Sequence, residues 1–255
     1  MKNRIVVITP FYNPGEFLEQ CAATLLSQNY DNFNVVFIDD ASTDGSFDKL
    51  DNIVRYTKYP GTIKVTIIKN EVRKTALENL HDALMNNCQP DDIAVFVDGD
   101  DWLPNKKVLS YINDFYNQHD CWVMYGQATW TDGRRGFASA YSEVEFKNLR
   151  KSPFRVSHLR TFRAGLYQKI YEQDPGFSSM KDSNGDFYKM TYDVAIMFPI
   201  MEMAGYDKVK FNDTILYTYN RSNPISDDRV NQSLQTGIHI DISKKTAFKQ
   251  IKSYK

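Results

Sequence analysis

Three carboxylates stand close together in residues 98–101, which read Asp-Gly-Asp-Asp. They directly follow an apolar run, residues 93–97, that is typical of a buried strand. Two carboxylates about 4 Å apart repel each other by about 4 kcal/mol at an effective dielectric constant of 20, and residues 95–105 contain no lysine or arginine to offset that charge. We therefore expect a divalent cation with oxygen ligands, Mg²⁺ or Mn²⁺. An acidic turn that caps a helix beginning near Pro104 is the alternative interpretation.

An apolar run followed by polar residues occurs twice more in the first forty residues. Asp39 and Asp40 follow residues 35–38, and residues 9–13 follow residues 5–8. In a parallel sheet the carboxyl ends of the strands meet at one edge, where α/β proteins bind ligands. An aromatic side chain at this edge, such as Tyr12, can stack on a nucleotide base. Asx and Ser/Thr turns would explain the composition around Asp39 without any ligand.

Apolar runs and helical periodicities alternate along the first hundred residues. Continuous β-branched and aromatic runs predict three strands buried on both faces, at residues 5–8, 35–38 and 93–97. The alternating run at residues 63–68 predicts a strand nearer an edge. Apolar side chains at helical spacing predict two helices, at residues 16–27 and 75–86. This alternation predicts an α/β fold with a mainly parallel central sheet flanked by helices.

The second half of the chain has weaker patterns. A strand is predicted at residues 121–125, and the apolar spacing predicts helices at residues 108–117, 162–171 and 194–204. Pro199 should bend the last helix or end its first turn. Residues 174–185 are rich in turn-forming residues and predict a loop. We expect one composite domain over residues 1–225 and a basic C-terminal extension over residues 226–255.

The composition excludes several classes of protein. The chain has 255 residues, 42% of them hydrophobic and 25% charged, which is the profile of a globular protein and not of a disordered chain or a coiled coil. Its 31 lysines and arginines balance 32 aspartates and glutamates, so nucleic acid is not an expected partner. Three widely spaced cysteines indicate a reducing compartment. No signal-peptide core or membrane-spanning run is visible, so we expect a cytoplasmic protein.

Three segments together resemble the family 2 glycosyltransferases, which have the GT-A fold. Residues 6–13 read VVITPFYN, residues 37–46 read FIDDASTDGS, and residues 97–103 read VDGDDWL. The resemblance implies a Rossmann-like sheet, a divalent metal and a nucleotide-diphosphate sugar donor, which we expect to be a UDP-sugar. It divides the domain into a nucleotide-sugar-binding half, residues 1–103, and an acceptor half, residues 104–225.

The resemblance also assigns donor-binding roles to individual residues. Pro10 and Phe11 would shape the pocket for the base, and Tyr12 would stack on the base. Asp39 would accept a hydrogen bond from it. Arg73 stands where the family often places a basic residue close to the donor, and a solvated helix start is the alternative interpretation for this residue.

The metal site follows from the same resemblance. Asp98 and Asp100 form the DxD motif of the family, with Asp98 near the ribose and the waters of the metal and Asp100 as the direct ligand of Mn²⁺ or Mg²⁺. Asp101 would be an adjacent helper. His158 or His239 would supply a third ligand, but a lone histidine is more often a packed or surface residue.

An inverting transfer needs a base that accepts the proton of the attacking hydroxyl. The family uses an aspartate at the start of a helix in the acceptor half, commonly after a glutamate. Asp193 matches that aspartate, with Tyr192 in place of the glutamate. An aspartate here also suits a helix N-cap, and the two roles are compatible. Glu202 is the alternative base, and Trp102 is the tryptophan expected to stack on a sugar face.

The remaining features concern the acceptor and rival functions. The QxxRW motif and membrane helices of processive members are absent from the sequence, so we expect one sugar to be added to a glycan, glycolipid or protein. Phe248 and Ile251 in the basic tail would allow weak peripheral membrane contact, but a docked or frayed terminus is the simpler interpretation. One rival is a phosphotransferase of the haloacid-dehalogenase type, which also has a DxD after a strand. The other is a transferase homologue that only binds nucleotide.

Overall fold

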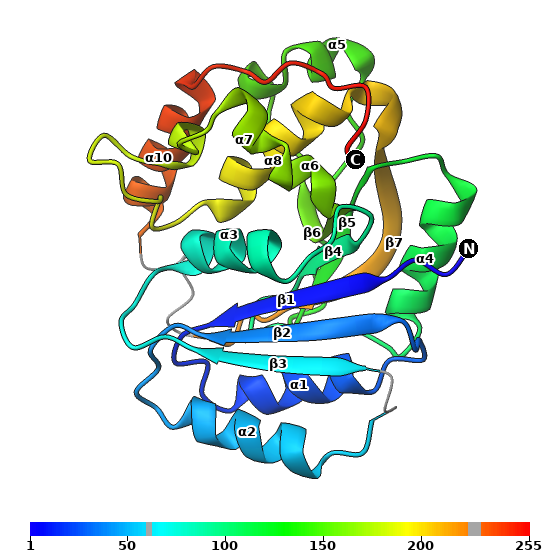
Figure 1. Cartoon of the computed structure of the whole chain (residues 1–255), viewed down its shortest axis with the longest axis vertical. Coiled ribbons are helices and arrows are strands. Elements are labelled where there is room, and N and C mark those ends of the chain that lie inside the picture. The colour runs from blue at the N-terminus through cyan, green and yellow to red at the C-terminus, as the bar shows by residue number, and fades with distance from the viewer. Residues whose placement is uncertain (60–62, 224–230) are drawn as a thin grey trace.

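The computed structural model describes residues 1–59, 63–223 and 231–255, and a seven-stranded mixed sheet forms its centre (Figure 1). The strand order is β3-β2-β1-β4-β6-β5-β7. Strands β1 to β4 pair in parallel, β6 runs antiparallel to both β4 and β5, and β7 pairs in parallel with β5. The bounds are β1 Ile5–Phe11, β2 Phe33–Asp39, β3 Lys64–Lys69, β4 Ile93–Phe96, β5 Val123–Trp130, β6 Ser157–Arg163 and β7 Val209–Tyr219.

Helices cover both faces of this sheet (Figure 1). Helices α1, α2 and α4 pack on one face, and α3, α6 and α8 pack on the other. This arrangement confirms the predicted α/β architecture with flanking helices. The bounds are α1 Phe17–Leu26, α2 Ser46–Tyr56, α3 Ala76–Asn86, α4 Val108–Gln118, α5 Glu143–Lys147, α6 Ala164–Gln168, α7 Ile170–Gln173, α8 Tyr192–Ala204 and α10 Gln232–Lys244, with 3₁₀ turns at Leu149–Lys151, Ser178–Met180 and Tyr206–Lys208.

Neighbouring residues of the central strands point into two different cores. In β1, Val6 and Ile8 pack with residues of α3 and α8, whereas Ile5 and Val7 pack with residues of α1 and α4. Because both faces are covered, apolar side chains are favoured at every position, as the continuous runs predicted. Strand β3 lies at the sheet edge, and its side chains are half-buried or exposed, which confirms the predicted edge position.

The structure differs from the sequence prediction around residue 162. The apolar spacing predicted a helix from that residue, but Phe162 lies fully buried in β6, and α6 begins only at Ala164. Strand β6 sits between β4 and β5, so pairing with strands distant in sequence decides its conformation. Helix α8 begins two residues earlier than predicted and is continuous through Pro199.

The C-terminal segment after α10 is docked against α8. The backbone N–H of Ile251 donates to the Met203 carbonyl at 2.9 Å, and that of Phe248 donates to Glu202 Oε2 at 2.9 Å. The side chains of Phe248 and Ile251 pack against the core. The predicted boundary between residues 225 and 226 lies outside the described residues. In the parts of the chain that the structure describes, no helix combines the length and apolar character needed to cross a membrane.

Candidate active site

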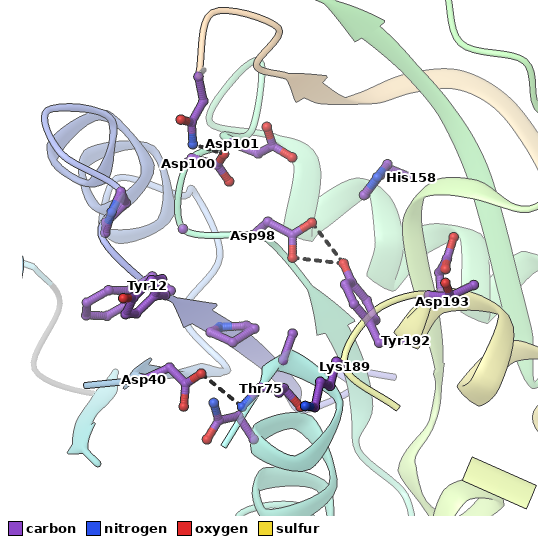
Figure 2. A pocket seen from close by; sticks show the side chains of 18 of the residues that line it. Tyr12, Asp40, Thr75, Asp98, Asp100, Asp101, His158, Lys189, Tyr192 and Asp193 are labelled. Atoms are coloured by element: carbon purple, nitrogen blue, oxygen red, sulfur yellow. Dashed lines mark hydrogen bonds between the residues drawn. The ribbon is translucent and has the colours of Figure 1, made fainter. Parts of the chain in front are cut away.

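A cleft of about 270 Å³ opens at the sheet edge where the parallel strands β1, β2 and β4 end (Figure 2). It collects most of the residues that the sequence singled out, namely Pro10, Phe11, Tyr12, Arg73, Asp98, Asp100, Asp101, His158 and Asp193. Among the described residues, the lining does not include four others, Asp39, Trp102, Glu202 and His239. In the view of Figure 2, Asp98 lies between Tyr12 on one side of the cleft and Asp193 on the other.

The acidic segment is held tightly against β1. The Gly99 N–H donates to the Pro10 carbonyl at 3.2 Å. A Cβ atom at Gly99 would collide with the side chain of Phe11, so only glycine allows this close approach. Asp98 and the residues that end β1 therefore share one wall of the cleft.

Tyr192 contacts Asp98 directly. Its hydroxyl lies 2.8 Å from each carboxylate oxygen of Asp98, to which it donates, and it accepts from Arg160 Nη1 at 3.4 Å. Burial and the charge of Asp100 raise the pKa of Asp98 to about 7, while Arg160 and the Tyr192 hydrogen bond oppose that rise. Ionised Asp98 is therefore unfavourable in the cleft unless a cation joins it.

The other two carboxylates of the motif have different surroundings. Asp101 is buried and accepts hydrogen bonds from the Tyr217 hydroxyl and the Asn220 N–H, both at 2.6 Å. Burial, together with the charges of Asp100 and Asp98, raises the pKa of Asp101 well above its usual range. Asp100 is half-buried, and its Oδ2 accepts from Asn223 Nδ2 at 2.7 Å. Asp101 thus ties the end of β4 to the end of β7.

A set of potential metal ligands lies in this part of the cleft. Ligand atoms of Asp98, Asp101 and His158 are all within 4.8 Å of one another. Burial and the charge of Arg160 hold the pKa of His158 well below its ordinary value, so the imidazole is neutral and able to ligate. The two carboxylates suit Mn²⁺ or Mg²⁺, whereas an imidazole is a less usual ligand for these ions. The direct ligand role of Asp100 stays a prediction, and His158 rather than His239 lies beside the carboxylates.

The charges along the cleft also favour the binding of a divalent cation. Among the described residues, three cations line it, Arg73, Arg160 and Lys189, against five carboxylates, Asp40, Asp98, Asp100, Asp101 and Asp193. A diphosphate would add further negative charge. A divalent cation at the carboxylate cluster would let an anionic ligand enter.

Tyr12, Arg73 and Asp40 together form one wall of the cleft. The guanidinium carbon of Arg73 lies 3.9 Å from the centre of the Tyr12 ring, and Arg73 Nε is 3.7 Å from Asp40 Oδ2. Asp40 also accepts from the backbone N–H groups of Lys74 at 2.8 Å and Thr75 at 2.9 Å. Arg73 therefore covers one face of the Tyr12 ring and holds the ring in place. The opposite face can then stack on a second planar group.

Asp39 is fully buried beneath this wall. Its Oδ1 accepts from the Ser42 N–H at 2.8 Å, whereas its Oδ2 has no hydrogen-bond partner among the described residues. A buried carboxylate oxygen without a donor is costly, so this atom is suited to accept from a ligand. The predicted contact of Asp39 with a base stays a prediction.

The start of α3 faces the cleft beside a cation. Thr75 has a φ of +92°, which is strained for a β-branched residue, and its Oγ1 is buried without a hydrogen-bond partner among the described residues, as is Asn79 Nδ2. Lys189 is exposed and forms no ion pair with any described residue. Figure 2 shows it reaching toward Thr75. A helix N-terminus beside a lysine suits an anionic group.

Asp193 lies in the first turn of α8, and the N-cap position considered for it belongs to Thr191. Arg160 is 4% exposed, and its Nη2 donates to Asp193 Oδ2 at 3.2 Å. The Asp193 side chain keeps 24% of its surface exposed. One carboxylate oxygen is thus anchored by a buried cation while the group still faces the cleft and solvent.

Three candidates from the sequence lie away from the cleft. Glu202 forms a buried ion pair with Arg150, with a contact of 2.6 Å, so it is placed as a packing residue and not as a base. His239 contacts the rings of Phe154 and Phe198. Trp102 forms an isolated antiparallel bridge with Thr218 in β7.

Sequence reasoning missed several cleft residues. Arg160 had no local signal, because it lies in β6, a strand that the sequence did not predict. Lys189 follows the predicted loop, whose composition pointed only to turns. Asp40 was placed beside Asp39 but given no separate role, since sequence alone does not tell which of two neighbouring carboxylates faces the cleft.

The family described as Glycosyl transferase family 2 matches the chain over residues 6–171, more than half of its length. An uncharacterized glycosyltransferase of Haemophilus influenzae is 30% identical over 115 residues, which are 45% of this chain and 43% of that protein. The poly(ribitol-phosphate) beta-glucosyltransferase of Bacillus spizizenii is 25% identical over 143 residues, which are 55% of this chain and 22% of that protein. The chain therefore spans less than half the length of either relative.

Solved structures of low sequence identity have a similar fold. TarS 1–349 of S. aureus matches with a TM-score of 0.62 and 18% identity over 85% of this chain and 60% of that one. The mannosyltransferase PcManGT from Pyrobaculum calidifontis, in complex with GDP-Man and Mn²⁺, matches with a TM-score of 0.63 and 17% identity over 97% of this chain and 66% of that one. These matches confirm the predicted GT-A fold.

Proposed function

This chain belongs to glycosyl transferase family 2, and we propose that it transfers one sugar from a nucleotide-diphosphate sugar to an acceptor hydroxyl. The observation that carries the proposal is a single cleft with three chemically distinct parts: the Tyr12 wall, the carboxylates around Asp98, and Asp193. A base, a diphosphate and an attacking hydroxyl would need these three parts in this order.

The donor is expected to be a UDP-sugar. TarS has been solved with UDP-GlcNAc and with UDP, and PcManGT with GDP-Man, which supports a nucleotide sugar of this kind. In this chain Tyr12 would stack on the base, with Arg73 covering the other face of the ring. Asp39 Oδ2 would accept from the base. Lys189 would face the diphosphate at the start of α3.

Asp98, Asp101 and His158 would hold the metal, expected to be Mn²⁺ or Mg²⁺, with Asp100 beside them. The Mn²⁺ in the PcManGT complex supports this assignment. A divalent cation, when bound, offsets the negative charge of a departing diphosphate. The residues themselves are suited to the ion because burial and mutual repulsion disfavour their charged forms without it.

Asp193 would act as the general base of an inverting transfer. Its free oxygen would accept the acceptor's hydroxyl proton as that oxygen bonds to the anomeric carbon, and the sugar–diphosphate bond would break with its electron pair leaving on the diphosphate. Arg160 would keep Asp193 oriented through their 3.2 Å contact. Attack from the side opposite the leaving group inverts the configuration.

A panel of nucleotide sugars tests the proposal. Wild-type protein should hydrolyse or transfer from at least one UDP-sugar when Mn²⁺ is present, and Asp98→Ala should lose that activity. An unchanged rate in Asp98→Ala would overturn the metal assignment. Turnover of aryl phosphates without turnover of any nucleotide sugar would favour the phosphotransferase rival, whose motif belongs on the first strand, whereas Asp98 here follows β4.

The acceptor is expected to be a glycan, glycolipid or protein. A membrane contact through the tail would require residues other than Phe248 and Ile251, because both pack against the core.

A further inference from the structure

Tyr192 connects the carboxylate of Asp98 with that of Asp193. Its hydroxyl lies 2.8 Å from both Oδ1 and Oδ2 of Asp98, as the dashed lines in Figure 2 show. The same hydroxyl lies 3.4 Å from Arg160 Nη1, and Arg160 Nη2 donates to Asp193 Oδ2 at 3.2 Å. One hydroxyl and one guanidinium thus bridge two carboxylates that come from different elements, the segment after β4 and the start of α8.

The chemistry of the three partners fixes the direction of the hydrogen bonds. A guanidinium can only donate and an ionised carboxylate can only accept. The Tyr192 hydroxyl must therefore accept from Arg160 and donate to Asp98. Burial and the charge of Asp98 raise the pKa of Tyr192 well above its ordinary value, so the hydroxyl keeps the proton that it donates.

The ring of Tyr192 is held from several sides. It packs against the core and meets the Phe96 ring edge-on, with 6.4 Å between ring centres. The Arg160 guanidinium carbon lies 5.7 Å from the centre of the ring. Thr191, directly before it, has a φ of +63°, in the left-handed region that a β-branched residue seldom adopts. The hydroxyl is thus carried by a side chain with little freedom to move away from Asp98.

Arg160 is fixed beside a further candidate ligand of the metal. It is 4% exposed, and its Nη1 and Nη2 lie 3.5 Å and 3.4 Å from the two ring nitrogens of His158. Its guanidinium therefore lies against the imidazole while it also contacts Tyr192 and Asp193. A displacement of any of these groups would be felt by the others.

The hydroxyl of Tyr192 can orient Asp98 without blocking a cation. An ionised carboxylate offers about four lone-pair sites, and one phenolic proton leaves most of them open. A carboxylate at position 192 would instead repel Asp98. Hydrogen bonds to a metal ligand hold it in the orientation that the ion needs, and their removal typically weakens metal binding or activity about 10–100-fold.

We propose that Tyr192 is a positioning residue, which orients Asp98 for a divalent cation and, through Arg160, holds Asp193 in place relative to that cation. The inference rests on the proposed function for its catalytic meaning, but its metal-binding part is measurable without any sugar. It gives a role to the position at which tyrosine replaces the glutamate that is common in the family.

Titration of the full chain with Mn²⁺ alone, with the free ion followed by electron paramagnetic resonance, tests the first part of the proposal. The variant is Tyr192→Phe, which keeps the ring against Phe96 and removes only the hydroxyl. The wild type should bind Mn²⁺, and Tyr192→Phe should bind it about tenfold more weakly because Asp98 loses its orienting donor.

Turnover of a UDP-sugar tests the second part. At Mn²⁺ concentrations that saturate the variant, the kcat of Tyr192→Phe should stay about tenfold below that of the wild type, because Arg160 and Asp193 are no longer aligned. The KM for the UDP-sugar should change less than kcat. A role in packing alone would move neither the Mn²⁺ affinity nor the ratio of kcat to KM.

Tyr116→Phe is the matched control. It also removes a buried tyrosine hydroxyl, one that contacts Thr161 Oγ1 at 3.0 Å between α4 and β6, away from the described lining of the cleft. This control should keep the Mn²⁺ affinity and the kcat of the wild type. Circular dichroism should show the same secondary structure in both variants.

Equal Mn²⁺ affinity in Tyr192→Phe and the wild type would overturn the proposal. Tighter binding in the variant would overturn it too, because the hydroxyl would then compete with the cation. Full recovery of kcat at saturating Mn²⁺ would overturn the link to Asp193. If the wild type binds Mn²⁺ but turns over no nucleotide sugar, the proposed function fails, while the comparison of Mn²⁺ affinities still decides whether Tyr192 orients Asp98.

Discussion

Replacing Asp98 by asparagine should stabilise the metal-free protein and abolish its response to Mn²⁺. The pKa of Asp98 rises from 3.8 to about 7 through burial and the charge of Asp100. Each pH unit of that rise corresponds to about 1.4 kcal/mol, so ionised Asp98 destabilises the metal-free fold by up to about 4 kcal/mol near pH 8. Asparagine keeps the shape and can accept from Tyr192 but carries no charge.

The stability difference between Asp98→Asn and the wild type should depend on pH in a defined direction. The folded chain holds the Asp98 proton more tightly than the unfolded chain does, so the contribution of this group to stability falls as the pH rises from about 4 to 7. Asp98→Asn should therefore melt above the wild type near pH 8 in EDTA, and the difference should shrink as the pH falls toward about 4.5. For a chain of this size, each kcal/mol moves the midpoint by about 2–4 °C.

Thermal unfolding followed by circular dichroism, with EDTA or MnCl₂, measures both effects. Mn²⁺ should raise the midpoint of the wild type and leave Asp98→Asn unchanged. The control is Asp207→Asn, which removes an exposed carboxylate that does not line the cleft and should behave like the wild type. A variant that melts at or below the wild type near pH 8 in EDTA, or a difference that does not depend on pH, would refute the reasoning.

Three further predictions concern other residues. Asp193→Asn should abolish transfer while calorimetry shows unchanged UDP binding; a loss of both would mean that Asp193 serves folding. Lys189→Ala should weaken UDP binding about fivefold and reduce the salt dependence of that binding, since an exposed charge contact contributes up to about 1 kcal/mol. If the variant and the wild type bind UDP with equal affinity at low and at high salt, Lys189 does not contact the diphosphate. Arg150→Met should lower the free energy of unfolding, measured in urea, by about 3–5 kcal/mol because it leaves the Glu202 carboxylate buried and without its ion-pair partner. Adding Glu202→Leu should restore stability. No loss of stability in the single variant would show that the ion pair does not stabilise the fold.

The part of the site around Tyr12 and Asp98 was predictable because its residues follow strands with strong local patterns. The continuous apolar runs of β1, β2 and β4 predicted the ends of three strands, and parallel pairing then brought Tyr12, Asp40 and Asp98 to one edge. The close approach at Gly99 is also consistent with the motif. Each of these features depends on a short stretch of sequence.

The part of the site around Arg160 and Asp193 was less predictable because long-range contacts decide it. Strand β6 forms between β4 and β5, and with it Arg160 reaches Asp193. Tyr192 appeared only as a departure from the family pattern, and its contact with Asp98 spans 94 positions of sequence. Helix α10 lines a cavity of about 500 Å³ next to Asp193, whereas its basic composition predicted only a terminal extension.

Calorimetric titration of UDP into the wild type and Asp98→Asn, each with Mn²⁺ and with EDTA, tests the central claim most directly. The claim is that the cleft binds a nucleotide diphosphate through a divalent cation held by the carboxylate cluster. UDP should bind the wild type with Mn²⁺ and lose most of its affinity both in EDTA and in Asp98→Asn. Equal UDP affinity in all four titrations, or no binding in any of them, would contradict the account.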